Sequence, residues 1–202
     1  MENESKTKRC KACKQIKELQ EFYKDKSRSD GYDNRCKECD RKRNSKPERK
    51  KSRLVSKQKR KAMKLALPNE LTTEEWNVIL ESFGSKCVLT GKVENVEMEH
   101  FIPLSIGHGG TCKGNVYPML KSLNGSKGNK NPLKWIQKQP HDLQVKFHRV
   151  LLPYLAQQNG MDVKTFKKYV NWCFKNKRKL KQVQTDNEKG LTSLGMFWEE
   201  IK

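Results

Sequence analysis

The sequence contains no run of apolar residues that approaches the roughly 18 residues needed to cross a membrane. Its first ten residues, MENESKTKRC, also lack the apolar segment of a secretory signal. We therefore expect an intracellular, cytoplasmic protein in a compartment that keeps thiols reduced. The seven cysteines are accordingly interpreted first as metal ligands or buried side chains, and only second as disulfides.

Acidic residues are scarce as well. The chain has 23 Asp and Glu against 44 Lys and Arg, a net charge of +21, which favours a polyanionic partner. Binding to an anionic membrane would need a basic amphipathic helix with large apolar residues opposite the charges. The most basic segment, residues 41–70, lacks that face, so nucleic acid is the predicted partner and a membrane is not.

Four of the cysteines form two C-x-x-C pairs, Cys10 with Cys13 and Cys36 with Cys39. Two-residue spacing lets both thiolates of a pair point at one ion, and two such pairs complete the tetrahedral shell that Zn²⁺ prefers. A disulfide framework is an alternative, but the sequence shows no secretory signal to support it. A redox C-x-x-C is another, but it would not need the second pair. Residues 1–40 are therefore predicted to be a zinc-binding module.

The apolar residues of this module are few: Ile16, Leu19, Phe22, Tyr23 and Tyr32. So small a set would barely fold alone, and we expect zinc binding to supply folding energy. All four ligand positions are filled by cysteine, which leaves no open position for catalysis. The predicted zinc is therefore structural.

Residues 41–70 are predicted to be a basic connector. Within them, residues 41–64 hold thirteen Lys or Arg residues against one acid, Glu48. The apolar residues here form no convincing stripe, so a free helix would be marginal in water. Two interpretations stay open, a solvated linker and an arm that tracks phosphates and becomes ordered on nucleic acid. The predicted contacts are Arg41, Lys42, Arg43, Arg49, Lys50, Lys51 and Arg53.

A folded core is predicted from Leu71 onward. Thr72 and Glu75 form a T-x-x-E capping box, and the apolar residues after it, beginning with buried Trp76, recur at helical spacing. Residues 87–91 are interpreted as a short strand and turn, and residues 93–98 as the next strand. Cys87 lacks a partner at C-x-x-C spacing and is expected to be a small buried side chain.

Residues 97–130 suggest the order strand, bend, strand, helix. Glu99-His100, the Gly109-Gly110 bend, Asn115-Val116, Leu123-Asn124 and Lys127 stand in the order of the HNH nuclease motif. The stretch resembles that family, which implies a ββα-metal fold. The resemblance runs from Leu71 to about Phe174.

The resemblance also implies roles for the polar residues. His100 would be the general base that activates a water molecule. Glu99 and Asn124 would place oxygens on one hard divalent ion, Mg²⁺ or Mn²⁺. Asn115 would hold the bend by hydrogen bonds to its backbone, and Lys127 would contact a phosphate.

This stretch departs from the family pattern at two positions. Asn124 stands where His is frequent, which favours Mg²⁺ over softer ions, and Glu99 stands where Asp is commoner. The cysteine pairs that some relatives carry around this core are missing, so the core is expected to hold no zinc. His108 is interpreted as either a phosphate contact or an exposed loop residue, and Cys112 as an incidental loop residue.

Helices are predicted to follow the motif. Pro153 should kink or split one of them, and Asp162 should cap the next, on which Cys173 faces the core. The region resembles the helical tail of phage-encoded HNH proteins, which would place the protein in a host cytoplasm. Basic residues 175–181 are expected to end the folded part, leaving residues 181–202 as a tail with at most a short helix.

The predicted fold class is α+β, a small ββα-metal core flanked by helices and preceded by a zinc module. The predicted parts are residues 1–40, 41–70, 71–180 and 181–202. The predicted function is a metal-dependent HNH endonuclease that nicks or cuts DNA. The alternatives are a zinc-containing DNA-binding protein with an inactive nuclease-like core, and an HNH nuclease that cuts RNA.

Overall fold

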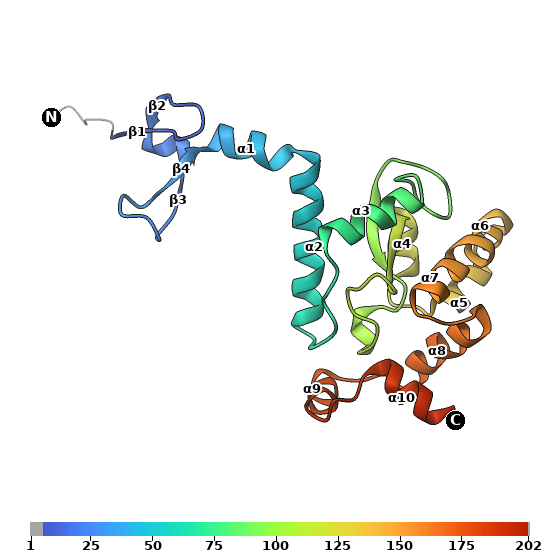
Figure 1. The fold of residues 1–202 in the computed structure, drawn as a ribbon. Helices are drawn as coiled ribbons and strands as arrows, with labels where there is room; N and C mark the ends of the chain where they lie inside the picture. The colour runs from blue at the N-terminus through green and yellow to red at the C-terminus, as the bar shows by residue number, and fades with distance from the viewer. Residues whose placement is uncertain (1–5, 202) are drawn as a thin grey trace. The chain divides into compact units, whose positions relative to one another are not determined.

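A computed structural model describes residues 6–201 (Figure 1). Contacts divide the chain into two compact units, Met1–Arg53 and Leu54–Lys202, and each is described by itself. The fold is α+β with small two-stranded sheets, as predicted. Within residues 6–201, none of the helices combines the length and apolarity that a membrane crossing requires.

Two short hairpins and a helix build the first unit. β1 pairs with β2 and β3 with β4, both antiparallel. Of the apolar residues predicted for its core, only Phe22 is buried, whereas Ile16 is 70% exposed and Tyr23 47% exposed. The apolar core is thus smaller than the sequence suggested. The elements are β1 (Thr7–Arg9), β2 (Ile16–Glu18), a 3₁₀ turn (Leu19–Glu21), β3 (Phe22–Lys24), β4 (Tyr32–Cys36) and α1 (Lys37–Ser45).

The basic connector is helical, as α2 (Pro47–Met63). The expectation that it presents no apolar stripe was wrong, because Val55 and Ala62 are buried. They lie seven residues apart, two turns along one helix face, and Val55 packs in a cluster with Leu71 and Trp76. A stripe made of one Val and one Ala is too weak to recognise from sequence.

The helix α3 (Thr73–Ser82) begins with the predicted capping box, confirmed by reciprocal bonds between Thr72 and Glu75. Trp76 is buried, also as predicted. Residues 87–91 form turns and no strand, which corrects the sequence interpretation. Cys87 is buried as expected, and the amide of Gly91 donates to its carbonyl at 2.8 Å.

The predicted strand, bend, strand, helix order is confirmed. β5 (Val96–His100) pairs antiparallel with β6 (Val116–Leu120), with His100 opposite Val116. Helix α4 (Lys121–Lys127) follows directly, and a 3₁₀ turn (Leu104–Ile106) lies in the bend. Together, β5, β6 and α4 form a ββα motif at the centre of the second unit (Figure 1).

Helices pack against one side of this ββα motif, around a buried aromatic cluster in which Phe101 contacts Phe147 and Phe166. Pro153 lies in the first turn of α7, two residues after a π-helical turn (Phe147–Leu151), where its missing amide hydrogen is tolerated. Asp162 caps its helix as predicted, accepting from the amide of Thr165 at 2.9 Å. These helices are α5 (Pro132–Trp135), a 3₁₀ turn (Ile136–Lys138), α6 (His141–Lys146), α7 (Leu152–Gln158) and α8 (Val163–Lys175).

The expected tail is folded. Residues 181–202 belong largely to α9 (Leu180–Glu188) and α10 (Ser193–Glu200), so the folded part does not end at residue 181. Val183 and Phe197 are almost fully buried, and the Phe197 ring lies 5.3 Å from that of Tyr169. Each helix is anchored by one or two apolar residues, too few to produce a periodic signal.

Candidate functional site

A groove of about 660 Å³ in the second unit collects three of the predicted site residues. Glu99 and His100 come from the end of β5, and Asn124 comes from α4. The antiparallel pairing of β5 with β6, followed at once by α4, is what brings residues 24 positions apart to the same groove. The groove is also lined by Gln58, Lys61, Lys64 and Leu65, at the end of α2 and beyond it.

His100 is 8% exposed and its ring is held on one side. Its Nε2 lies 2.9 Å from Oγ1 of Thr111. Burial, and to a smaller extent the positive charges of Lys127 and Lys61, lower the pKa of His100 to about 4. The imidazole is therefore neutral at pH 7 and able to accept a proton.

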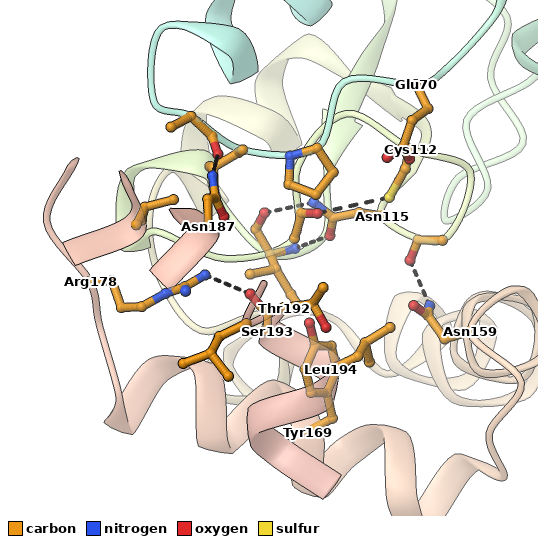
Figure 2. Close-up of a pocket in the computed structure, with 18 residues that line it drawn as sticks. Glu70, Cys112, Asn115, Asn159, Tyr169, Arg178, Asn187, Thr192, Ser193 and Leu194 are labelled. Atoms are coloured by element: carbon orange, nitrogen blue, oxygen red, sulfur yellow. Dashed lines mark hydrogen bonds between the residues drawn. The ribbon is translucent and has the colours of Figure 1, made fainter. Parts of the chain in front are cut away.

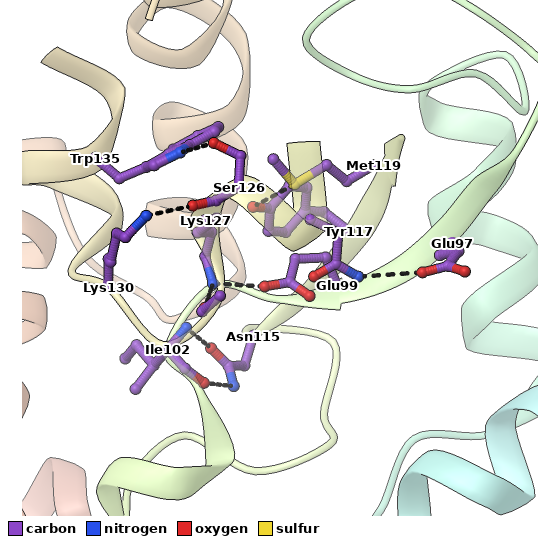
Figure 3. A network of polar contacts seen from close by, with 12 residues as sticks. Glu97, Glu99, Ile102, Asn115, Tyr117, Met119, Ser126, Lys127, Lys130 and Trp135 are labelled. Carbon is purple, nitrogen blue, oxygen red and sulfur yellow. Dashed lines mark hydrogen bonds and ion pairs between the residues drawn. The ribbon is translucent and has the colours of Figure 1, made fainter. Parts of the chain in front are cut away.

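Glu99 forms a buried ion pair. Nζ of Lys127 lies 2.5 Å from Oε1 of Glu99 and also donates to the carbonyl of Gly128 at 3.2 Å (Figure 3). Burial raises the pKa of the Glu99 carboxyl and lowers the pKa of Lys127, and each is opposed by the charge of the other. The contact engages one carboxylate oxygen and leaves the other for a different partner.

Asn115 ties the bend to the end of β5. Its Oδ1 accepts from the amide of Ile102 at 2.8 Å, and its Nδ2 donates to the carbonyl of Ile102 at 3.0 Å (Figure 3). Nδ2 also donates to the carbonyl of Gly110 at 2.8 Å. Gly109 has φ +77°, and a Cβ there would meet Nδ2 of Asn115 at 2.5 Å. The glycine is required because the backbone passes so close to this amide. These bonds fix the chain two residues beyond His100.

Asn124 contacts a carboxylate that the sequence interpretation did not include. Its Nδ2 donates to Oε2 of Glu97 at 3.3 Å (Figure 3). Glu97 and Glu99 lie two residues apart on β5 and therefore on the same face. That alternation is the signal from which Glu97 could have been found. The bond also directs the amide nitrogen of Asn124 to Glu97 and leaves its oxygen as a possible metal ligand.

Lys127 does not have the position predicted for a phosphate contact, because its side chain is 0% exposed and paired with Glu99. Lys61 and Lys64 line the groove and are exposed. They were overlooked because they belong to the connector, where nothing distinguished them from the other lysines. The cations that can reach a substrate at His100 come from this segment.

The predicted nucleic-acid contacts of the first unit lie on α1 and the start of α2. Two of them are engaged in ion pairs, Lys42 with Glu38 at 2.9 Å and Arg43 with Asp40 at 2.6 Å. The exposed ones are Arg41, Lys42, Arg49, Lys50 and Arg53, and the half-buried ones are Arg43 and Lys51. The exposed set leaves a helical surface that can follow a phosphate backbone.

The four cysteines of the first unit meet as the spacing predicted. The sulfurs of Cys10, Cys13, Cys36 and Cys39 all lie within 4.8 Å of one another, so the cluster could hold a metal ion. The amide of Cys36 donates to Sγ of Cys10 at 3.3 Å. Burial opposes ionisation of Cys10, but backbone hydrogen bonds from Cys13, Cys36 and Ala12 outweigh it and lower its pKa to about 6. A thiolate at this position suits a metal ligand.

A second cavity, of about 290 Å³, lies beneath the glycine bend. Asn115 and Cys112 line it on one side, and Tyr169, Arg178 and Ser193 line it on the other (Figure 2). His100 is not among the residues that line it. Cys112 is thus a lining residue with its pKa raised to about 11 by burial.

His108 fits neither sequence interpretation, because it is fully buried. Its Nε2 lies 2.6 Å from the carbonyl of Asn176 and its Nδ1 lies 3.0 Å from Oγ of Ser193. Arg178 joins the same network by donating to Oγ of Ser193 at 2.7 Å. His108 therefore attaches the bend to the C-terminal helices.

Comparisons of the chain with protein-family models, with curated proteins and with solved structures gave no match.

Proposed function

We propose that the chain is a metal-dependent endonuclease that hydrolyses phosphodiester bonds in DNA, with RNA as the less favoured substrate. The observation that supports the proposal is the groove that gathers Glu99, His100 and Asn124. The motif singled out these residues on sequence order alone, and the fold brings Asn124 of α4 to the same groove as Glu99 and His100 at the end of β5. The basic surfaces of α1 and α2 suit a polyanionic substrate.

The donor set fits a hard divalent ion. Glu99 and Asn124 would hold Mg²⁺ or Mn²⁺ through a carboxylate and an amide oxygen, and such ions are commonly bound by few protein oxygens together with water and phosphate. A bound ion of this kind neutralises charge on the scissile phosphate and stabilises the leaving 3′ oxygen.

The chain's own residues supply the remaining chemistry. His100 takes a proton from the attacking water, and a phosphate anion beside the ring raises its pKa towards the working pH. Asn115 holds the end of β5 so that the imidazole keeps its orientation. Lys61 and Lys64 offer cations to the phosphates that flank the reacting one.

We infer further that the four-cysteine cluster holds a structural Zn²⁺. The first unit buries only Phe22 among its predicted core residues, besides Cys10 and Cys36. An apolar core of this size does not stabilise fifty residues, whereas a tetrathiolate zinc site contributes folding free energy directly. The four sulfurs fill a tetrahedral shell and leave no position for substrate.

The nuclease proposal is tested by relaxation of supercoiled plasmid. Purified protein with Mg²⁺ or Mn²⁺ is expected to nick the plasmid, and His100→Ala should reduce the rate by roughly 10²- to 10⁴-fold. His141→Ala, at an exposed histidine on α6, is the matched control and should keep the rate. Equal nicking by His100→Ala and wild type would defeat the proposal.

One observation favours a second function, a zinc-containing DNA-binding protein with an inactive core. Lys127 neutralises Glu99 without a metal, so the core satisfies its buried carboxylate by itself. Such a protein would bind duplex DNA with a steep salt dependence and leave it intact with every divalent ion. Binding without cleavage by wild-type protein would select this function.

A further inference from the structure

Thr111 connects the proposed general base to the basic helix. Its side chain is fully buried in the bend. Oγ1 lies 2.9 Å from Nε2 of His100 and 3.2 Å from the carbonyl oxygen of Gln58 on α2. The backbone of Thr111 is fixed as well, because its amide donates to the carbonyl of Pro68 at 2.8 Å and its carbonyl accepts from the amide of Leu71 at 3.1 Å.

The donor and acceptor inventory of these three groups allows only one arrangement that satisfies both contacts. A hydroxyl has one hydrogen to donate, and a carbonyl oxygen can only accept. The hydrogen of Thr111 therefore points to Gln58, and its oxygen accepts from His100. In the opposite arrangement Thr111 would donate to His100, and two oxygens would face each other at 3.2 Å without a hydrogen between them.

We propose that Thr111 is a positioning residue that holds His100 in the tautomer with hydrogen on Nε2, so that Nδ1 is the nitrogen that accepts a proton. The role in catalysis rests on the proposed nuclease function, whereas the tautomer is a property of the free protein. In catalytic and metal-binding histidines generally, the hydrogen bond made by one ring nitrogen decides which of the two nitrogens carries the hydrogen.

The arrangement also makes α2 part of the site. The carbonyl that fixes the Thr111 hydrogen belongs to Gln58, on the same helix as the groove residue Lys61. Val55 and Ala62 hold that part of α2 against the core. The tautomer of His100 therefore depends on the docking of a helix that the sequence suggested was a linker or an arm.

The test is ¹⁵N NMR of the histidine ring nitrogens in the free, metal-free protein at neutral pH. Wild-type His100, assigned with a His100→Gln variant, should show a protonated, pyrrole-type Nε2 and an unprotonated, pyridine-type Nδ1. Thr111→Val, which removes the hydroxyl at nearly constant volume, should shift the population towards the other tautomer. Thr111→Ser, which keeps the hydroxyl, should restore the wild-type pattern.

The ring of His108 reports whether each variant is folded, because its partners Asn176 and Ser193 are independent of Thr111. A wild-type His100 with hydrogen on Nδ1 would overturn the proposal. An unchanged His100 tautomer in folded Thr111→Val would overturn it too.

Plasmid nicking gives the second readout. Thr111→Val is expected to lower kcat by about 10- to 100-fold with little change in KM for DNA, and Thr111→Ser should recover most of the rate. If wild-type protein cuts no DNA while the NMR result holds, the proposed function fails and the tautomer assignment stands. If the protein cuts DNA but Thr111→Val cuts at the wild-type rate, the positioning role is overturned.

Discussion

The buried pair between Lys127 and Glu99 allows a quantitative prediction. Lys127→Met leaves a carboxylate with 11% side-chain exposure next to an apolar group, and removal of one partner of a buried ion pair costs about 3 to 5 kcal/mol. Glu99 can reduce this cost by taking up a proton, so we expect about 3 kcal/mol at pH 7. Glu99→Gln should destabilise the protein to a similar extent because it leaves the ammonium without its charge partner.

The double variant measures the interaction energy between Lys127 and Glu99 apart from the effect of each single substitution. With Lys127→Met and Glu99→Gln together no unpaired charge is buried, so the loss should be smaller than the sum of the two single losses by about 1 to 3 kcal/mol. The assay is urea unfolding of the full-length chain. Lys130→Met, at an exposed lysine three residues further on, is the matched control and should change stability by less than about 0.5 kcal/mol.

The pH dependence has a definite sign. In Lys127→Met the pKa of buried Glu99 rises above its unfolded value, so the folded state binds the proton more tightly. The variant should therefore be least destabilised below the unfolded pKa of about 4.3 and lose stability as pH rises through the folded pKa. Additive single losses, or equal losses in Lys127→Met and Lys130→Met, would refute the buried pair.

Three further predictions concern other parts of the chain. The wild-type protein should contain one zinc per chain by elemental analysis, and Cys36→Ser should lose it; retention of the metal would contradict the cluster assignment. Burial lowers the pKa of His108 to about 4 from 6.5, so the unfolded chain takes the proton first and stability should fall by about 3 kcal/mol between pH 6.5 and 4. His108→Gln should remove this contribution and leave the one from His100, whose pKa is also lowered to about 4, and an unchanged slope would speak against it. Lys61→Ala should lower the salt slope of DNA binding by about 0.9, whereas Lys59→Ala on the same helix should not; equal effects would remove the groove from the binding surface.

Elements with a strong local signal could be predicted from the sequence. The capping box at Thr72, the cysteine pairs, and the β5–β6–α4 order each depend on residues close together in the chain, where turn chemistry and periodicity decide the conformation. The burial of Trp76 and Cys87 was also predicted correctly from the sequence.

Features that depend on distant contacts could not be predicted. Lys127 looked like a surface cation because a buried lysine becomes favourable only once Glu99 is known to face it. His108 gave no sign that Asn176 and Ser193 would enclose it. The C-terminal helices α9 and α10 were not predicted because each buries one apolar residue, Val183 or Phe197. Whether such a residue is buried depends on its contacts with the core and not on the local sequence.

The central claim is tested most directly by mapping the ends of a labelled DNA duplex cut by the protein with Mg²⁺ or Mn²⁺. Because the account makes the 3′ oxygen the leaving group, it predicts 3′-hydroxyl and 5′-phosphate ends that DNA ligase can rejoin, and roughly 10²- to 10⁴-fold slower formation of these ends with His100→Ala. Ends that carry a 3′-phosphate, or the same ends in the same amount from His100→Ala, would contradict it.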